Sequence, residues 1–140
     1  MKLILKTLVF SIILFVIVLS GCKNSNPYTP DNSSYNKAVI GNASNSFSYT
    51  IDAQHYTYDQ KLPIQFDAKS LSIAASVTNF VVGSGNLIIM DSAGTALYDR
   101  KLTGPLAAAD LIEIFNQPKF VSISFTNFTG KVSINFSGGQ

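Results

Sequence analysis

The chain has 140 residues, of which 46% are hydrophobic and 13% are charged, with ten Lys and Arg against eight Asp and Glu. This balance lacks the clustered basic charge that nucleic-acid binding needs, so we predict no nucleic-acid partner. Cys22 is the only cysteine, which excludes a disulfide within the chain. His55 is the only histidine, which argues against a zinc site.

The first 21 residues have the three parts of a secretory signal peptide. Lys2 and Lys6 give a positive start, the residues from 8 to 19 are almost all apolar, and small residues precede Cys22. The apolar run is shorter than the roughly 20 residues that a membrane-spanning helix needs. We therefore expect residues 1–21 to direct export and to be removed.

This segment ends in Leu19-Ser20-Gly21-Cys22, which resembles the lipobox of bacterial lipoproteins at every position. The resemblance covers only about the first 22 residues. It implies cleavage between Gly21 and Cys22, a diacylglyceryl group on the Cys22 thiol, and an acyl chain such as palmitate on the new amino group. The alternatives are an ordinary signal peptide with a chance cysteine and an uncleaved anchor. Lipidation is favoured because it gives a use to an otherwise unpaired exported thiol.

The same resemblance implies an address in the cell envelope. In some bacteria, Asp directly after the lipidated cysteine favours retention in the inner membrane. Lys23 stands at that position, so we expect a lipid-anchored protein, in the outer membrane if the host has one. Membrane lipid attached to Cys22 is the one partner that the sequence names.

The segment 22–34 contains Pro27 and Pro30 among polar residues and has no apolar periodicity. Such a segment cannot bury enough surface to offset the entropy lost on ordering, so we expect a lipidated N-terminus and flexible tether. Residues 35–140 fit a single domain by length. Removal of residues 1–21 takes two lysines and no acid, which leaves the remainder near neutral.

The domain shows apolar residues at every second position, the pattern of half-buried strands. Pro63 indicates that its strand lies at a sheet edge. Asp91-Ser92-Ala93-Gly94 and Asn127-Phe128-Thr129-Gly130 each predict a hairpin turn, and Gly83-Ser84-Gly85 predicts a further turn between strands. The alternation predicts strands within 46–52, 55–59, 62–66, 71–78, 86–91, 95–100, 121–126 and 132–137.

The stretch from Gly104 to Phe115 is ambiguous. Thr103 could cap a helix and three consecutive alanines favour one, whereas Leu111–Phe115 could be a buried strand. We predict one or two helical turns near 105–115. Short strands separated by turns predict an all-β, antiparallel β-sandwich, either jelly-roll-like or immunoglobulin-like, with a closed β-barrel as the alternative.

No catalytic or metal site is predicted, and no cofactor. Gly83-Ser84-Gly85 lacks the third glycine and the following helix of a dinucleotide loop. His55 fits the polar face of a strand better than the role of a catalytic base, because no serine lies in a nucleophile motif. Asp91 supplies too few oxygen atoms for calcium.

Tyr49, Tyr56 and Tyr58 are the candidates for ligand contact, because tyrosine offers an amphipathic binding surface. Packing in the core or at its rim is the alternative for all three. The predicted function is therefore a non-enzymatic domain, held on a membrane, that binds a protein, a glycan or an envelope component. The alternative is a small hydrolase or a carrier of a lipophilic ligand with an unrecognised site.

Overall fold

The computed structural model describes residues 34–139, and within them every regular element is a β-strand. The predicted signal peptide, the lipobox-like sequence and the predicted tether up to residue 33 lie outside the described residues. No helix within 34–139 is long and apolar enough to cross a membrane. The strands are β1 (Val39–Ala43), β2 (Ser46–Pro63), β3 (Ser70–Met90), β4 (Ala96–Leu102), β5 (Leu106–Glu113) and β6 (Phe120–Gly139).

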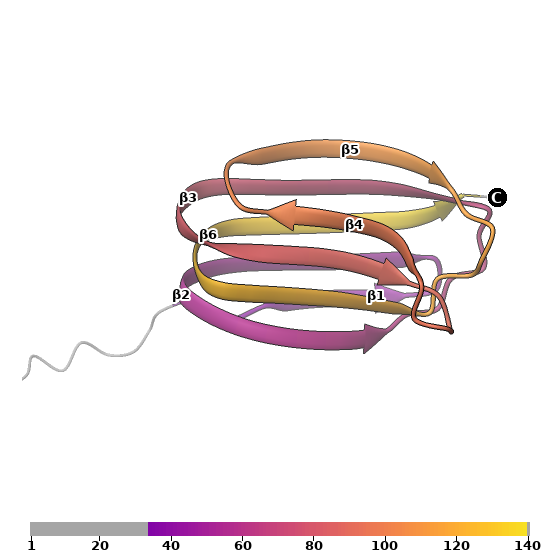
Figure 1. Ribbon diagram of the computed structural model, residues 1–140, viewed down its shortest axis with the longest axis horizontal. Coiled ribbons are helices and arrows are strands. Elements are labelled where there is room, and N and C mark those ends of the chain that lie inside the picture. The colour runs from indigo at the N-terminus through magenta and orange to yellow at the C-terminus, as the bar shows by residue number, and fades with distance from the viewer. Residues whose placement is uncertain (1–33, 140) are drawn as a thin grey trace, which may run out of the picture. The chain divides into compact units, whose positions relative to one another are not determined.

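Three of these strands are long enough to run through both layers of a sandwich. β2, β3 and β6 have 18, 21 and 20 residues, and all of their pairings are antiparallel. Their ladders shift register in the middle, between Ala53 and Tyr58 of β2 and between Thr78 and Ser84 of β3. Figure 1 shows the three strands bending back at the same end of the domain.

The pairing assigns each half-strand to one of two layers. In the first layer the order is β1, residues 46–53 of β2, 130–139 of β6, 70–78 of β3, and β5. In the second layer it is residues 56–63 of β2, 120–128 of β6, 84–90 of β3, and β4. This interleaving of β2, β3 and β6 is the connectivity of a jelly roll. The predicted sandwich is confirmed, and the closed-barrel alternative is wrong because the sheet is open.

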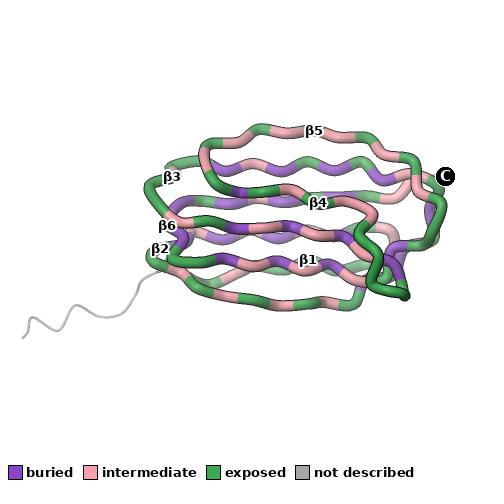
Figure 2. Tube along the Cα trace, in the orientation of Figure 1, coloured by how far each residue is buried: buried purple, intermediate pink, exposed green. Residues whose placement is uncertain are grey.

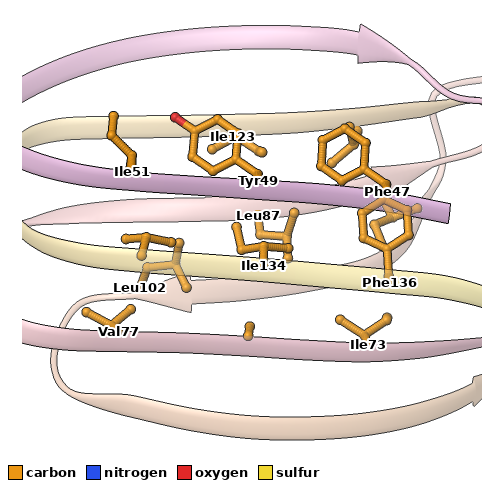
Figure 3. Packing of buried hydrophobic residues seen from close by; sticks show 14 of the residues in the cluster. Phe47, Tyr49, Ile51, Ile73, Val77, Leu87, Leu102, Ile123, Ile134 and Phe136 are labelled. Atoms are coloured by element: carbon orange, nitrogen blue, oxygen red, sulfur yellow. The ribbon is translucent and has the colours of Figure 1, made fainter. Parts of the chain in front are cut away.

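The core lies between the two layers and follows the predicted alternation. Figure 2 shows buried and exposed positions alternating along the long strands, and Figure 3 shows the buried side chains packed together. Phe47 and Phe136 stack with their ring centroids 4.8 Å apart. The core side chains are those of Phe47, Tyr49, Ile51, Ala53, Ile64, Phe66, Leu71, Ile73, Ala75, Val77, Leu87, Ile89, Leu102, Val121, Ile123, Phe125, Phe128, Val132, Ile134 and Phe136.

Two of the predicted turns are bends inside continuous strands. Asn127–Gly130 was expected to close a hairpin, and Gly83–Gly85 was expected to separate two strands. Instead β6 and β3 continue through them and cross from one layer to the other. Asn127 has a φ of 46° and Gly83 a φ of 99°. Residues with a left-handed backbone conformation occur in hairpin turns, but they also occur where a strand bends. The prediction of turns at these two positions was therefore wrong.

The predicted helix near 105–115 is also wrong. Residues Leu106–Glu113 form β5, which pairs with Ser70–Val77 of β3. Leu106 and Ile112 both pack against the core. They lie on the same face of β5 because side chains of a strand alternate between its two faces. Pairing with β3 therefore outweighs the helix preference of the alanines. The hairpin at Asp91–Gly94 is confirmed, as is the edge position of Pro63, since that half of β2 ends the second layer.

Candidate binding surface

The three candidate tyrosines lie close together but in different environments. Tyr49 is fully buried, and Figure 3 shows its ring among the core side chains. Tyr56 and Tyr58 are half-buried where β2 passes into the second layer, and their rings stack with centroids 5.4 Å apart. Tyr49 therefore presents no surface to a ligand from outside. Contact of Tyr56 and Tyr58 with a ligand remains a prediction.

Burial controls the ionisation of all three hydroxyl groups. It raises the pKa of Tyr49 far above the ordinary value, and the neighbouring Tyr56 and Tyr58 raise it further. Burial also raises the pKa of Tyr56 and of Tyr58. The Tyr49 hydroxyl has no hydrogen-bond partner within residues 34–139. The cluster therefore stays neutral at physiological pH and offers no general base.

The corner next to these tyrosines holds His55. His55 has a φ of 48° and lies at the bend of β2, where its backbone N–H donates to Thr129 Oγ1 at 2.9 Å. Its Nδ1 lies 3.1 Å from Asn127 Oδ1, and the Asn127 backbone N–H donates to Thr57 Oγ1 at 3.0 Å. These contacts join the bends of β2 and β6. His55 is thus an exposed residue of β2, and its contacts hold the corner of that strand.

Asp91 organises the confirmed hairpin turn. Its Oδ1 accepts the backbone N–H groups of Ala93 at 2.9 Å and Thr95 at 2.8 Å, and its Oδ2 accepts from Asn116 Nδ2 at 2.9 Å. These hydrogen bonds, the one from Thr95 first, hold the pKa of the Asp91 carboxyl below its usual value. Within residues 34–139 no group of three His, Cys, Asp or Glu side chains is arranged to hold a metal ion.

A polar cluster that the sequence did not reveal joins the two layers at their β4–β5 side. Asp110 Oδ2 accepts from Tyr98 Oη and from Arg100 Nη2, each at 2.6 Å, and Arg100 Nε donates to Tyr98 Oη at 3.0 Å. The hydrogen bonds from Tyr98 and Arg100 lower the pKa of Asp110. Since β4 and β5 belong to different layers, this cluster closes one side of the sandwich.

The described surface has hollows rather than a deep ligand cavity. One hollow of about 280 Å³ lies over β3, β5 and β6, is open to solvent and is lined mainly by alanine and serine. It falls just below the range of about 300 to 1,000 Å³ that is usual for small-molecule sites. This geometry gives no support to the carrier alternative.

The remaining exposed feature is an apolar strand edge. Tyr35, Val39 and Ile40 are 44%, 72% and 40% exposed, and all three belong to the segment that forms and precedes β1. Every residue of β1 is exposed, and none is charged. Sequence reasoning missed β1 because Val39–Ala43 has no alternating pattern. Further exposed apolar side chains lie at the β3 bend, at Val81 and Val82, on the edge strand β5, at Leu111, which is 76% exposed, and after β5, at Phe115.

Comparison with known proteins gives no family. No protein-family model matches the chain, and no curated protein matches it. Among solved structures, a subunit of the disulfide-linked pili that form Bacillus endospore appendages aligns with a TM-score of 0.45 and 11% identity. That alignment covers 74% of this chain and 92% of the pilus chain. The VP2 subviral particle of infectious bursal disease virus aligns with a TM-score of 0.40 and 14% identity, over 74% of this chain and 32% of that chain. At these TM-scores the likeness carries no conclusion, and the jelly-roll assignment rests on the strand pairing.

Proposed function

We propose that this chain is an envelope lipoprotein that holds a non-enzymatic jelly-roll domain on a membrane and uses it to bind a protein, a glycan or another envelope component. The attachment is through lipid on Cys22, and the Lys23 that follows favours the outer membrane if the host has one. The lipobox-like sequence supports the attachment. Two or three acyl chains on one cysteine give lasting anchorage, whereas a single chain binds only marginally.

The observation that supports a binding role is the exposed β1 edge. Val39 keeps 72% of its surface exposed, on a strand without any charge. Apolar residues that gather at an unpaired edge are typical of a surface that another molecule covers. The domain also places its charged cluster, Arg100 with Asp110, between its own layers, where the two side chains satisfy one another.

Anchoring is tested by Cys22→Ser in the full chain, expressed in a bacterium and labelled with a palmitate analogue. We expect the variant to take up no label and to keep the precursor's mass, because the residue that carries the lipid is gone. Normal processing and labelling of the variant would refute the attachment through Cys22.

Binding is tested by cross-linking the full chain to envelope fractions, with Val39→Lys compared against Val81→Lys. The two valines are 72% and 70% exposed, so they form a matched pair, and only Val39 lies on β1. We expect a specific cross-linked product that Val39→Lys loses and Val81→Lys keeps. Turnover of a substrate that disappears in His55→Ala would instead favour the hydrolase alternative.

A further inference from the structure

Four strand edges end the two layers of the domain. β1 and β5 end the first layer, while residues 56–63 of β2 and the whole of β4 end the second. An unpaired edge offers backbone N–H and C=O groups to any other strand. Proteins block such edges with charges, proline, bulges or inward-pointing charged side chains. The four edges can therefore be compared by which of these protective features each one has.

Three of the edges are blocked. The β2 edge carries the charged Lys61 and ends in Pro63. β4 sends Arg100 inward to pair with Asp110, and its ladder with β3 shifts register near Met90. β5 carries the inward-pointing Asp110 of the same pair.

β1 has no such device. It contains neither charge nor proline, and it pairs with β2 without a register shift. Ala43 pairs with Ser46 around a two-residue turn, so these two residues form a hydrogen-bonded pair of the ladder. By the alternation of an antiparallel ladder, the backbone groups of Ile40 and Asn42 then face away from β2. Within residues 34–139, the shortness of β1, which has 5 residues, is the one feature of this strand that limits pairing there.

We propose that β1 of one copy pairs antiparallel with β1 of a second copy across a two-fold axis, which joins the first layers of two domains into one sheet. Such a contact uses the same surface on both copies, so the edge has to complement itself. With Gly41 on the axis, Val39 falls opposite Ala43, and every residue that β1 contributes to the pairing is uncharged. Self-pairing therefore places no like charges against each other, which would oppose association.

The outer face of the first layer beside β1 also favours a second copy as the partner. The neighbouring part of β2 presents Ser46, Ser48 and Thr50 outward, so two first layers can approach side by side without charge repulsion. The inference deepens the proposed function, since it names a second copy as a partner of the anchored domain. The pairing involves few hydrogen bonds, and anchoring on one membrane raises the effective concentration that makes such a contact productive.

Disulfide trapping tests the pairing directly. The full chain carrying Val39→Cys together with Ala43→Cys is reconstituted in phosphatidylcholine vesicles and oxidised, with Val81→Cys as the matched control of equal exposure. In the proposed register the two new cysteines face each other across the axis, in non-hydrogen-bonded pairs whose Cβ atoms lie about 5 Å apart, close enough for a disulfide after a small adjustment. We expect a covalent dimer from the double variant and little from the control. Equal yields from the two would overturn the pairing.

Ile40→Pro, added to the double variant, tests whether backbone bonds hold the dimer. Its N–H faces away from β2, so proline removes a bond between copies and none within the domain. One bond is lost from each copy, which should lower the dimer yield by about tenfold or more. Unchanged circular dichroism checks the fold, and Gly41→Lys, which puts two lysines together on the axis, repeats the test. A yield that neither change lowers would refute the inference.

Anchoring and pairing can fail separately. The double variant with Cys22→Ser in concentrated solution removes the lipid and keeps β1. A covalent dimer there, sensitive to Ile40→Pro, supports the pairing whatever the fate of the anchor. A dimer that is insensitive to Ile40→Pro, or no dimer in either setting, contradicts the pairing and leaves the palmitate test of Cys22 unaffected.

Discussion

Replacing Gly83 by alanine should destabilise the domain more than a change at either of two other glycines. Gly83 lies at the bend of β3 with a φ of 99°, a conformation that residues with a Cβ rarely adopt. A Cβ built at Gly83 would lie 2.3 Å from the carbonyl oxygen of Asn127 and 2.6 Å from Phe128 Cα. Both contacts are with the backbone of β6, so no side chain can rotate away to relieve them.

Two control variants separate the conformational effect from the steric one. Gly94 also has a positive φ, 84°, but a Cβ there would meet nothing within 4 Å. Gly104 has neither a positive φ nor a close neighbour. Gly94→Ala should lose about 1 to 2 kcal/mol through the left-handed conformation alone. Gly104→Ala should be neutral or gain up to about 1 kcal/mol, because it restricts the unfolded chain.

Gly83→Ala should lower the free energy of unfolding by the same conformational cost and by a further 1 to 3 kcal/mol, roughly, from overpacking. The total loss should be about 2 to 5 kcal/mol. Urea unfolding followed by circular dichroism gives the three free energies, provided that the slopes agree. If Gly83→Ala were no more destabilising than Gly94→Ala, β3 and β6 would not approach closely at this corner, and the description of both strands as continuous bends would be wrong.

Two further predictions concern ionisable groups. Tyr49→Phe should change stability at pH 7 by less than about 1 kcal/mol, because the hydroxyl that it removes has no partner. The folded state holds the pKa of Tyr49 above 10.0, the value of the unfolded chain. Above about pH 10 the hydroxyl therefore ionises in the unfolded chain first, and the domain should lose about 1.4 kcal/mol of stability per pH unit. Tyr49→Phe should flatten this alkaline loss in unfolding curves, and an unchanged alkaline slope would contradict the burial of the hydroxyl. Asp110 has a folded pKa below 3.8, so its contribution is present above about pH 4 and is lost as the pH falls through the folded value. Asp110→Asn should weaken the acid dependence of unfolding relative to an Asp99→Asn control, and equal profiles for the two variants would argue against the contact between β4 and β5.

The alternating pattern predicted which residues fill the core, because one face of each strand has to leave water. Tyr49 stands in phase with Phe47 and Ile51, so the same period contained the signal for its burial. Tyr56 and Tyr58 follow the bend at which the register of the ladder shifts. The two-residue period that begins at Phe47 therefore does not predict how far these two side chains are buried. A local period thus identifies faces well as long as the strand stays regular.

The remaining features depend on contacts between distant parts of the chain. Asn127 and Gly83 give the same local signal whether a strand turns back beside itself or bends into another layer, so the sequence alone does not distinguish a bend from a turn. β5 is a strand because β3 lies beside it, although its alanines prefer a helix. Arg100 and Asp110 meet across the layers, and no spacing along the chain indicates that contact.

The measurement that tests the central claim most directly is the mass of the N-terminal peptide of the protein isolated from bacterial membranes. Attachment through lipid predicts a peptide that begins at Cys22 and carries the added mass of a diacylglyceryl group, with or without an additional acyl chain. A chain that retains residues 1–21, or one that begins at Cys22 with an unmodified thiol, would contradict it.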